Sequence, residues 1–147
     1  MPALTFLAFD YGKTSIGVAV GSTVSGQAQD LTTVKSVSGQ PDWKHISGLV
    51  QEWQPQGFVV GLPLNMDDSE SPTTTAAREF GNRLGGRYNL PVHMVDERLT
   101  TVAARHSLAQ SAVPMRRHKS RLDRVAAQTI LQTFLDEQTR TDLKREP

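Results

Sequence analysis

The 147-residue sequence contains no cysteine, which excludes disulfide bonds, a thiolate zinc site and a cysteine nucleophile. Long hydrophobic runs are also missing. The longest apolar stretch, residues 4–9, is interrupted by Thr5 and is far shorter than the ~20 residues that cross a bilayer. No basic segment precedes it, so no signal peptide is expected. These absences favour a cytoplasmic protein in a reducing compartment.

The sequence also lacks a strong net charge, which is only +1, but its charges are unevenly distributed. Between positions 98 and 124 there are seven basic residues and one acid, a net charge of +6, whereas the rest has nine basic and fourteen acidic residues, net −5. The basic residues are Arg98, Arg105, Arg116, Arg117, Lys119, Arg121 and Arg124. Such a block is typical of phosphate-binding surfaces and equally of a solvated helix face beside a loop.

The hydrophobic pattern predicts one α/β domain over residues 1–138, followed by a charged tail at 139–147. Strands are expected at 4–9, 16–20, 28–37, 58–62 and 92–95, and helices at about 42–53, 72–84, 101–109 and 121–138. Residues 63–71 and 110–120 are expected to be loops, and Gly85-Gly86 is expected to end the second helix. This order implies a mixed five-stranded sheet with helices on its faces.

Ligands of such sheets usually bind beyond the carboxyl ends of the parallel strands. Asp10 ends the first, apolar strand, and Asp96-Glu97 end the last. Because successive side chains of a strand alternate between faces, only one of Asp96 and Glu97 can point the same way as Asp10. Structural roles remain open for these acids: an Asx-turn for Asp10, and helix capping for the pair.

Asp123 lies on the apolar stripe of the predicted last helix, at helical spacing from Ala127, Ile130, Leu131 and Phe134. An acid on a stripe that faces the sheet needs a partner inside the protein, and the ends of the strands that carry Asp10 and Glu97 are the nearest candidates. Three converging carboxylates repel one another unless cations neutralise them. Oxygen-only ligands favour Mg²⁺ or Mn²⁺, and two such ions can promote phosphodiester cleavage.

Other motifs fail. Gly12-Lys13-Thr14 resembles the end of a P-loop, but Leu7 occupies the position of the required earlier glycine. The four histidines have no paired metal-ligand spacing. An actin-like or sugar-kinase ATPase would need two large domains, which 147 residues cannot supply.

Four segments in the right order resemble the YqgF/RuvX family over about residues 4–136. They are 9–20 (FDYGKTSIGVAV), 60–67 (VGLPLNMD), 96–101 (DERLTT), and Asp123 followed by Ala126-Ala127 and Ile130-Leu131. The resemblance implies a ribonuclease H-like fold with Asp10, Glu97 and Asp123 as a metal-binding acidic triad. It also implies either maturation of the 5′ end of the 16S rRNA precursor or resolution of Holliday junctions.

From this resemblance we expect a two-metal endonuclease that cleaves the 16S rRNA precursor, and we expect the small ribosomal subunit as a further partner. A junction resolvase would need paired active sites and therefore a homodimer, and a non-catalytic RNA- or ribosome-binding module is the alternative from another class. The expected phosphate-binding residues are Lys13, Arg98, Arg116, Arg117, Lys119 and Arg121. The order Gly-Lys-Thr at 12–14, where many members have Gly-Thr-Lys, leaves the role of Lys13 open. Two alternatives remain for Arg124: its side chain contacts nucleic acid, or it only points to solvent.

Overall fold

The computed structural model describes residues 4–97 and 115–145, with the side chains of the last segment described over 121–139. The chain forms β1 (Thr5–Asp10), β2 (Ser15–Ser22), β3 (Ala28–Val37), β4 (Gln40–Pro41), α1 (Trp43–Trp53), β5 (Gly57–Leu62), α2 (Pro72–Tyr88), β6 (Val92–Asp96) and α4 (Met115–Arg145). The helix predicted at 101–109 lies outside the described residues. No described helix is long and apolar enough to span a membrane.

The strands form one mixed sheet in the order β4-β3-β2-β1-β5-β6. β1 to β4 pair antiparallel, whereas β5 is parallel to both β1 and β6. The predicted mixed sheet is confirmed, and the additional strand is the two-residue β4. The hairpin from β3 to β4 turns through Ser38 and Gly39, whose φ angles of 50° and 79° suit a type I′ turn.

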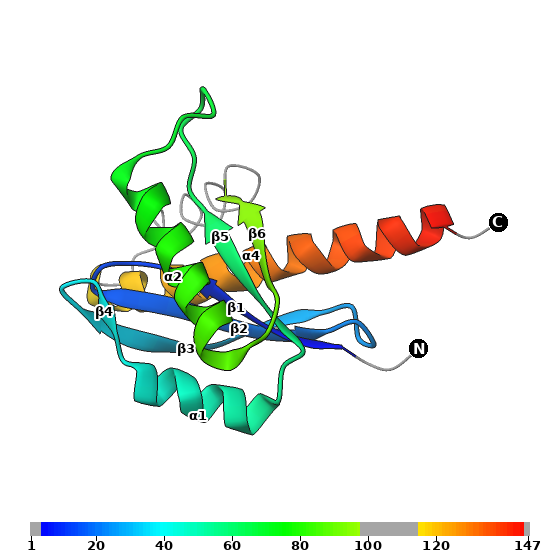
Figure 1. Cartoon of the computed structure of the whole chain (residues 1–147), viewed down its shortest axis with the longest axis horizontal. Coiled ribbons are helices and arrows are strands. Elements are labelled where there is room, and N and C mark those ends of the chain that lie inside the picture. Colours follow the sequence, from blue (N-terminus) through cyan, green and yellow to red (C-terminus); the bar gives the residue numbers. More distant parts are fainter. Residues whose placement is uncertain (1–3, 98–114, 146–147) are drawn as a thin grey trace.

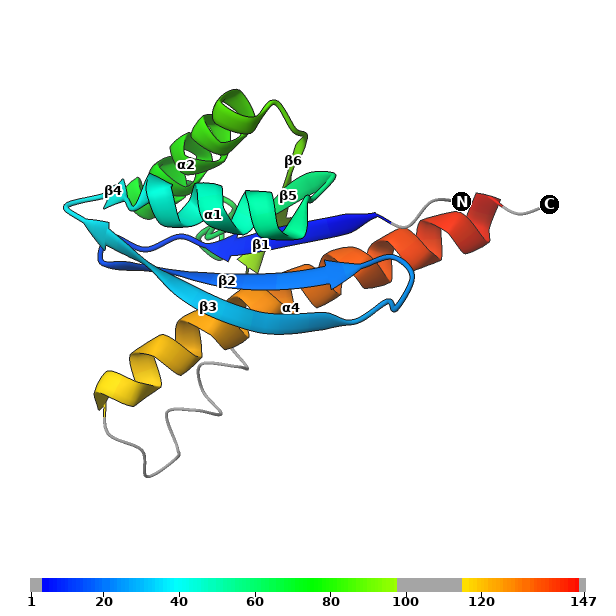
Figure 2. The ribbon, with the colours of Figure 1, turned by 90° about the horizontal axis from the view of Figure 1, so that it is seen from below.

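Helices cover both faces of the sheet, α1 and α2 on one and α4 on the other (Figures 1 and 2). The side chains of β1 therefore alternate between two apolar layers: Leu7 and Phe9 face α1 and α2, whereas Phe6 and Ala8 face α4. By this alternation the next residue, Asp10, belongs to the α4 face. β1 lies between β2 and β5, so Asp10 ends a central strand.

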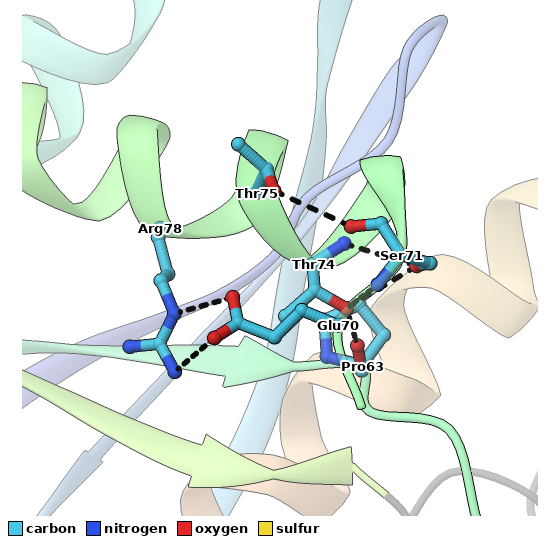
Figure 3. A network of polar contacts seen from close by, with 6 residues as sticks. All are labelled: Pro63, Glu70, Ser71, Thr74, Thr75 and Arg78. Atoms are coloured by element: carbon cyan, nitrogen blue, oxygen red, sulfur yellow. Dashed lines mark hydrogen bonds and ion pairs between the residues drawn. The ribbon is translucent and has the colours of Figure 1, made fainter. Parts of the chain in front are cut away.

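The loop that follows β5 is held by the start of α2 (Figure 3). Ser71 and Thr74 form a capping box, in which each side chain accepts a hydrogen bond from the other residue's backbone N–H. The Thr74 hydroxyl also donates to the carbonyl of Pro63, and the Thr74 residue is fully buried. One buried hydroxyl thus connects the end of β5 to the helix.

Replacing Thr74 by valine is expected to lower the free energy of unfolding by about 1–3 kcal/mol. The substitution keeps the shape but removes both the bond to the Pro63 carbonyl and the reciprocal cap. Urea unfolding measures the change, with the exposed Thr73→Val as the matched control on the same helix turn. Equal stability of the two variants would contradict a stabilising role for the buried hydroxyl.

Two helix boundaries differ from the sequence prediction. α2 continues through Gly85 and Gly86 and ends at Tyr88, with Asn89 as a left-handed cap. A helical glycine costs only ~1 kcal/mol, which the packing of the helix offsets. α4 begins at Met115 and ends at Arg145 instead of spanning 121–138. Its outer turns are polar, so hydrophobic periodicity gave no signal there.

Candidate active site

The site is organised around Asp10, which has a glycine on each neighbouring strand. Asp10 pairs with Gly17 across the antiparallel β1–β2 ladder. On the other side, Phe9 pairs with Val60 in the parallel β1–β5 ladder, which places Gly61 level with Asp10. The two glycines thus leave the α4 face without a Cβ atom on either side of the Asp10 carboxylate.

Gly17 allows α4 to approach the sheet at Asp123. A Cβ atom on Gly17 would lie 1.9 Å from the backbone oxygen of Asp123 and 2.2 Å from its carbonyl carbon. The helix backbone therefore occupies the space that a side chain would fill. This close approach places Asp123 against the α4 face of the β1–β2 ladder, over Gly17, the residue that pairs with Asp10.

Gly61 gives Glu97 the corresponding space on the other side. A Cβ atom on Gly61 would lie 2.9 Å and 3.0 Å from Cγ and Cδ of Glu97. The Glu97 side chain therefore covers Gly61 on the α4 face, the face to which Val95, two residues earlier, also belongs. Asp96 has the parity of Val92 and Met94, which pack on the opposite face. Of the two acids at the end of the last strand, Glu97 is therefore the one that points to the same face as Asp10.

Ser15 orients the third acid. Its hydroxyl, at the start of β2, donates a hydrogen bond to Oδ2 of Asp123. Ser15 and Gly17 share a parity on β2, so this bond turns the carboxylate toward the same face of the sheet. Ser15 was not singled out from the sequence, although it lies within the segment 9–20, because its partner Asp123 is 108 positions further along the chain.

The donor set fits a hard divalent cation. Asp10 and Glu97 are 5% and 7% exposed, and both lie with Asp123 at one edge of the α4 face. Carboxylate oxygens are the ligands that Mg²⁺ and Mn²⁺ prefer. Over residues 4–97 and 121–139, however, no three acidic or histidine side chains are already grouped closely enough to hold an ion. The three carboxylates therefore share one edge and one face of the sheet, but in this structure they are not drawn together around a common point.

The predicted basic residues do not all lie beside the acids. Arg116, Arg117 and Lys119 are in the first turns of α4, the helix that carries Asp123, and Arg121 is exposed one turn later. Arg98 lies outside the described residues. Lys13 is exposed in the turn between β1 and β2, where it lines a cavity with Arg83 on the α2 side of the sheet.

Arg124 has a structural partner. Its Nε atom lies 3.5 Å from Oδ2 of Asp30 on β3. The two roles that the sequence left open, solvent exposure and nucleic-acid contact, do not account for this ion pair between α4 and the sheet. Both side chains are partly exposed, so the pair contributes little to stability.

The strand order and the helices on both faces define a ribonuclease H-like fold. Two solved structures share it: Thermus thermophilus RuvC bound to a Holliday junction substrate and a second structure of that RuvC, with TM-scores of 0.52 and 0.50. The alignments cover 92% and 94% of this chain and 96% and 98% of those chains, at 14% and 12% identity. At such identities the likeness concerns the fold alone.

The chain belongs to the RuvX family, whose model, described as a Holliday junction resolvase, matches residues 4–137. A relative from Haemophilus ducreyi is 49% identical over 134 residues, covering 91% of this chain and 97% of the relative. One from Nitrosococcus oceani is 52% identical over 132 residues, covering 90% and 86%. Both carry the name "putative pre-16S rRNA nuclease". The family predicted from the four motifs is confirmed.

Proposed function

We propose that this protein is a metal-dependent endonuclease that cleaves structured nucleic acid in the cytoplasm, with the 5′ flank of the 16S rRNA precursor as its preferred substrate. The observation that carries the proposal is the placement of Asp10, Glu97 and Asp123 at one edge of one sheet face. The names of relatives that share about half of its residues support the choice of substrate.

In this proposal Asp10, Glu97 and Asp123 hold Mg²⁺ or Mn²⁺, two ions in all. When bound, such ions activate water and stabilise the charge that develops on the leaving oxygen. Asp10 lies between the other two acids, since Gly17 and Gly61 flank it in the sheet. Ser15 holds the Asp123 carboxylate on this face through its hydrogen bond. Burial of Asp10 and Glu97 limits the access of bulk water to the carboxylates.

The basic residues near Asp123 would bind the phosphates of the substrate. Arg116, Arg117 and Lys119 precede Asp123 in α4 by four to seven positions, Arg121 precedes it by two, and Arg98 follows Glu97 directly in the sequence. Phosphate contacts of this kind set position and affinity and carry no base specificity. They make binding sensitive to salt.

Reversing Arg116 and Arg117 to glutamate is expected to weaken binding to every nucleic acid tested and to reduce the salt slope by about 1 for each phosphate that is no longer bound. Fluorescence anisotropy at several salt concentrations measures both effects. The matched control reverses Arg140 and Lys144, which lie on the same helix ~35 Å further along by helix geometry. An unchanged affinity and slope in the Arg116/Arg117 variant would remove these residues from the interface.

The substrate is tested by direct comparison. Purified protein is incubated with a precursor 16S rRNA fragment that carries its 5′ flank, with mature-length RNA and with a four-way DNA junction, each in Mg²⁺, Mn²⁺ or EDTA. We expect metal-dependent cleavage of the precursor fragment at a defined position and little cleavage of the other two. Salt-sensitive binding without a product in any metal would favour the non-catalytic RNA- or ribosome-binding module instead.

Junction resolution is the second candidate, and the description of the family model favours it. Symmetric cleavage of a four-way junction needs two active sites at a fixed separation, hence a homodimer. Sedimentation of the protein with and without junction DNA separates the candidates. A monomer that cleaves only precursor RNA supports the rRNA function, whereas a dimer that cuts paired junction strands supports resolution.

A further inference from the structure

A hollow surface lies on the opposite side of the sheet from the three acids. A cavity of about 410 Å³ is bordered by the β1–β2 turn, the β3–β4 hairpin and α2, and its lining includes Tyr11, Lys13, Phe80 and Arg83. It shares Gln40 and Arg83 with a second hollow of about 520 Å³, which Trp43 and Arg87 also line. We refer to the two hollows together as the α2 groove.

Aromatic rings form one wall of the α2 groove. The ring of Phe80 lies between those of Tyr11 and Trp43, with centroids 5.1 Å and 5.8 Å away. The guanidinium carbon of Arg87 lies 4.4 Å from the centroid of the Trp43 ring. Aromatic rings and guanidinium planes are the two surfaces on which proteins stack unpaired nucleobases.

The α2 groove is also positively charged. Lys13, Arg83 and Arg87 line it together with a single acid, Glu79. Within the part of the chain that the structure describes, none of these three cations forms an ion pair. By contrast, Arg78 on the same helix lies outside both hollows and is paired with Glu70 at 2.9 Å (Figure 3). Lys13 and Arg83 thus have no charged partner among the described residues that a ligand would have to displace, whereas Arg87 is already engaged with the Trp43 ring.

The wall opposite α2 is preformed. The Tyr11 hydroxyl donates a hydrogen bond to the carbonyl of Gly39 at 3.0 Å, which fixes the ring against the β3–β4 turn. Ser38 in that turn has a φ of 50°, a conformation that non-glycine residues adopt only when their surroundings impose it. A rigid wall lowers the entropic cost of binding.

The groove is connected to the acids through β1. Asp10 faces α4, and the next residue, Tyr11, lines the groove on the other side of the sheet. A nucleic-acid strand that places a phosphate at Asp10 can therefore pass the end of β1 and reach Tyr11 and Lys13. Continuing along α2, it meets Arg83 and then Arg87, one turn further.

We propose that the α2 groove binds unpaired nucleotides of the substrate strand beside the cleaved phosphate, with bases stacked on Tyr11 and on the Arg87 guanidinium that lies over Trp43, and phosphates on Lys13 and Arg83. The proposal rests on the nuclease function and extends it to a preference for substrates with a single-stranded flank. The aromatic wall favours a nucleobase over an acidic peptide, because carboxylates would use only the cations.

The fluorescence of Trp43 tests the groove without cleavage. The sequence has two tryptophans, and Trp53→Phe leaves Trp43 as the sole reporter, since Trp53 lies at the other end of α1. Titration of this variant with a hexanucleotide RNA in EDTA is expected to quench its emission. Adding Arg83→Ala and Arg87→Ala should weaken binding about tenfold or more, whereas Arg78→Ala should leave it unchanged.

Three further measurements decide the outcome. An abasic hexamer is expected to bind at least about tenfold more weakly than the RNA. Equal binding of the abasic hexamer or of a hexaglutamate peptide would overturn the proposal in favour of a general anion surface. If the Trp53→Phe protein still cleaves the precursor but shows no quenching, the groove proposal is wrong and the nuclease proposal stands. If RNA quenches the emission but the protein cleaves none of the substrates, the proposal that the groove binds nucleotides stands and the nuclease proposal is wrong.

Discussion

Asp10→Asn is expected to abolish metal-dependent cleavage while the protein stays folded. The amide has the size of the carboxylate and fits the same buried position, but it carries no charge to hold a cation between Asp123 and Glu97. Metal-ion catalysis contributes several kcal/mol of transition-state stabilisation, and ~4 kcal/mol corresponds to ~10³-fold in rate. We therefore expect the cleavage rate in Mg²⁺ to fall at least about 10³-fold, measured under single-turnover conditions.

Asp96→Asn is the matched control for this experiment. Asp96 precedes Glu97 directly but belongs to the opposite face of the sheet, so its replacement leaves the proposed metal ligands in place. Its cleavage rate should remain within about threefold of the wild type, because asparagine keeps the shape of this half-buried side chain and the side chain lies on the face of the sheet opposite the three acids. Wild-type cleavage by Asp10→Asn, or an equal loss in both variants, would contradict the assignment of Asp10.

Gly17→Ala is expected to have the largest effect on stability. Its new methyl group would lie 1.9 Å from the backbone oxygen of Asp123, and a helix backbone cannot move aside as a flexible side chain does. α4 would have to shift away from the sheet, which takes Asp123 with it. We expect a loss of about 3 kcal/mol in the free energy of unfolding, at the upper end of overpacking effects, together with loss of cleavage.

Gly48→Ala provides the control for Gly17→Ala. Gly48 lies within α1, where an added Cβ atom meets nothing within 4 Å. Alanine there should raise stability by about 0.5–1 kcal/mol, because it lowers the entropy cost of forming the helix. Urea unfolding of both variants measures the change in the free energy of unfolding, which should be negative for Gly17→Ala and positive for Gly48→Ala. Similar stabilisation by both would mean that α4 does not approach β2 as described.

Much of the fold was accessible from the sequence because burial imposes a pattern on it. β1 and β5 are covered on both faces and appear as continuous apolar runs, and the stripe of α4 from Ala127 to Phe134 has a helical period. The same logic placed Asp123 toward the sheet. Its hydrogen bond to Ser15 confirms that orientation, although its role as a metal ligand stays a prediction.

Other features left no pattern to find. The importance of Gly17 and Gly61 lies in their closeness to Asp123 and Glu97, which are far away in the sequence. The α2 groove combines Tyr11, Trp43 and Arg83 from three elements, and each alone is an ordinary partly exposed residue. The shifted position of Lys13 was visible in the sequence, but its neighbours in the groove were not.

The most direct test of the metal site is a crystal structure of the protein soaked with Mn²⁺, with the ion located by its anomalous scattering. We predict Mn²⁺ on the α4 face, coordinated directly by the carboxylates of Asp10, Glu97 and Asp123. Mn²⁺ bound elsewhere, with Asp123 still held by Ser15 and contributing no ligand, would contradict this assignment.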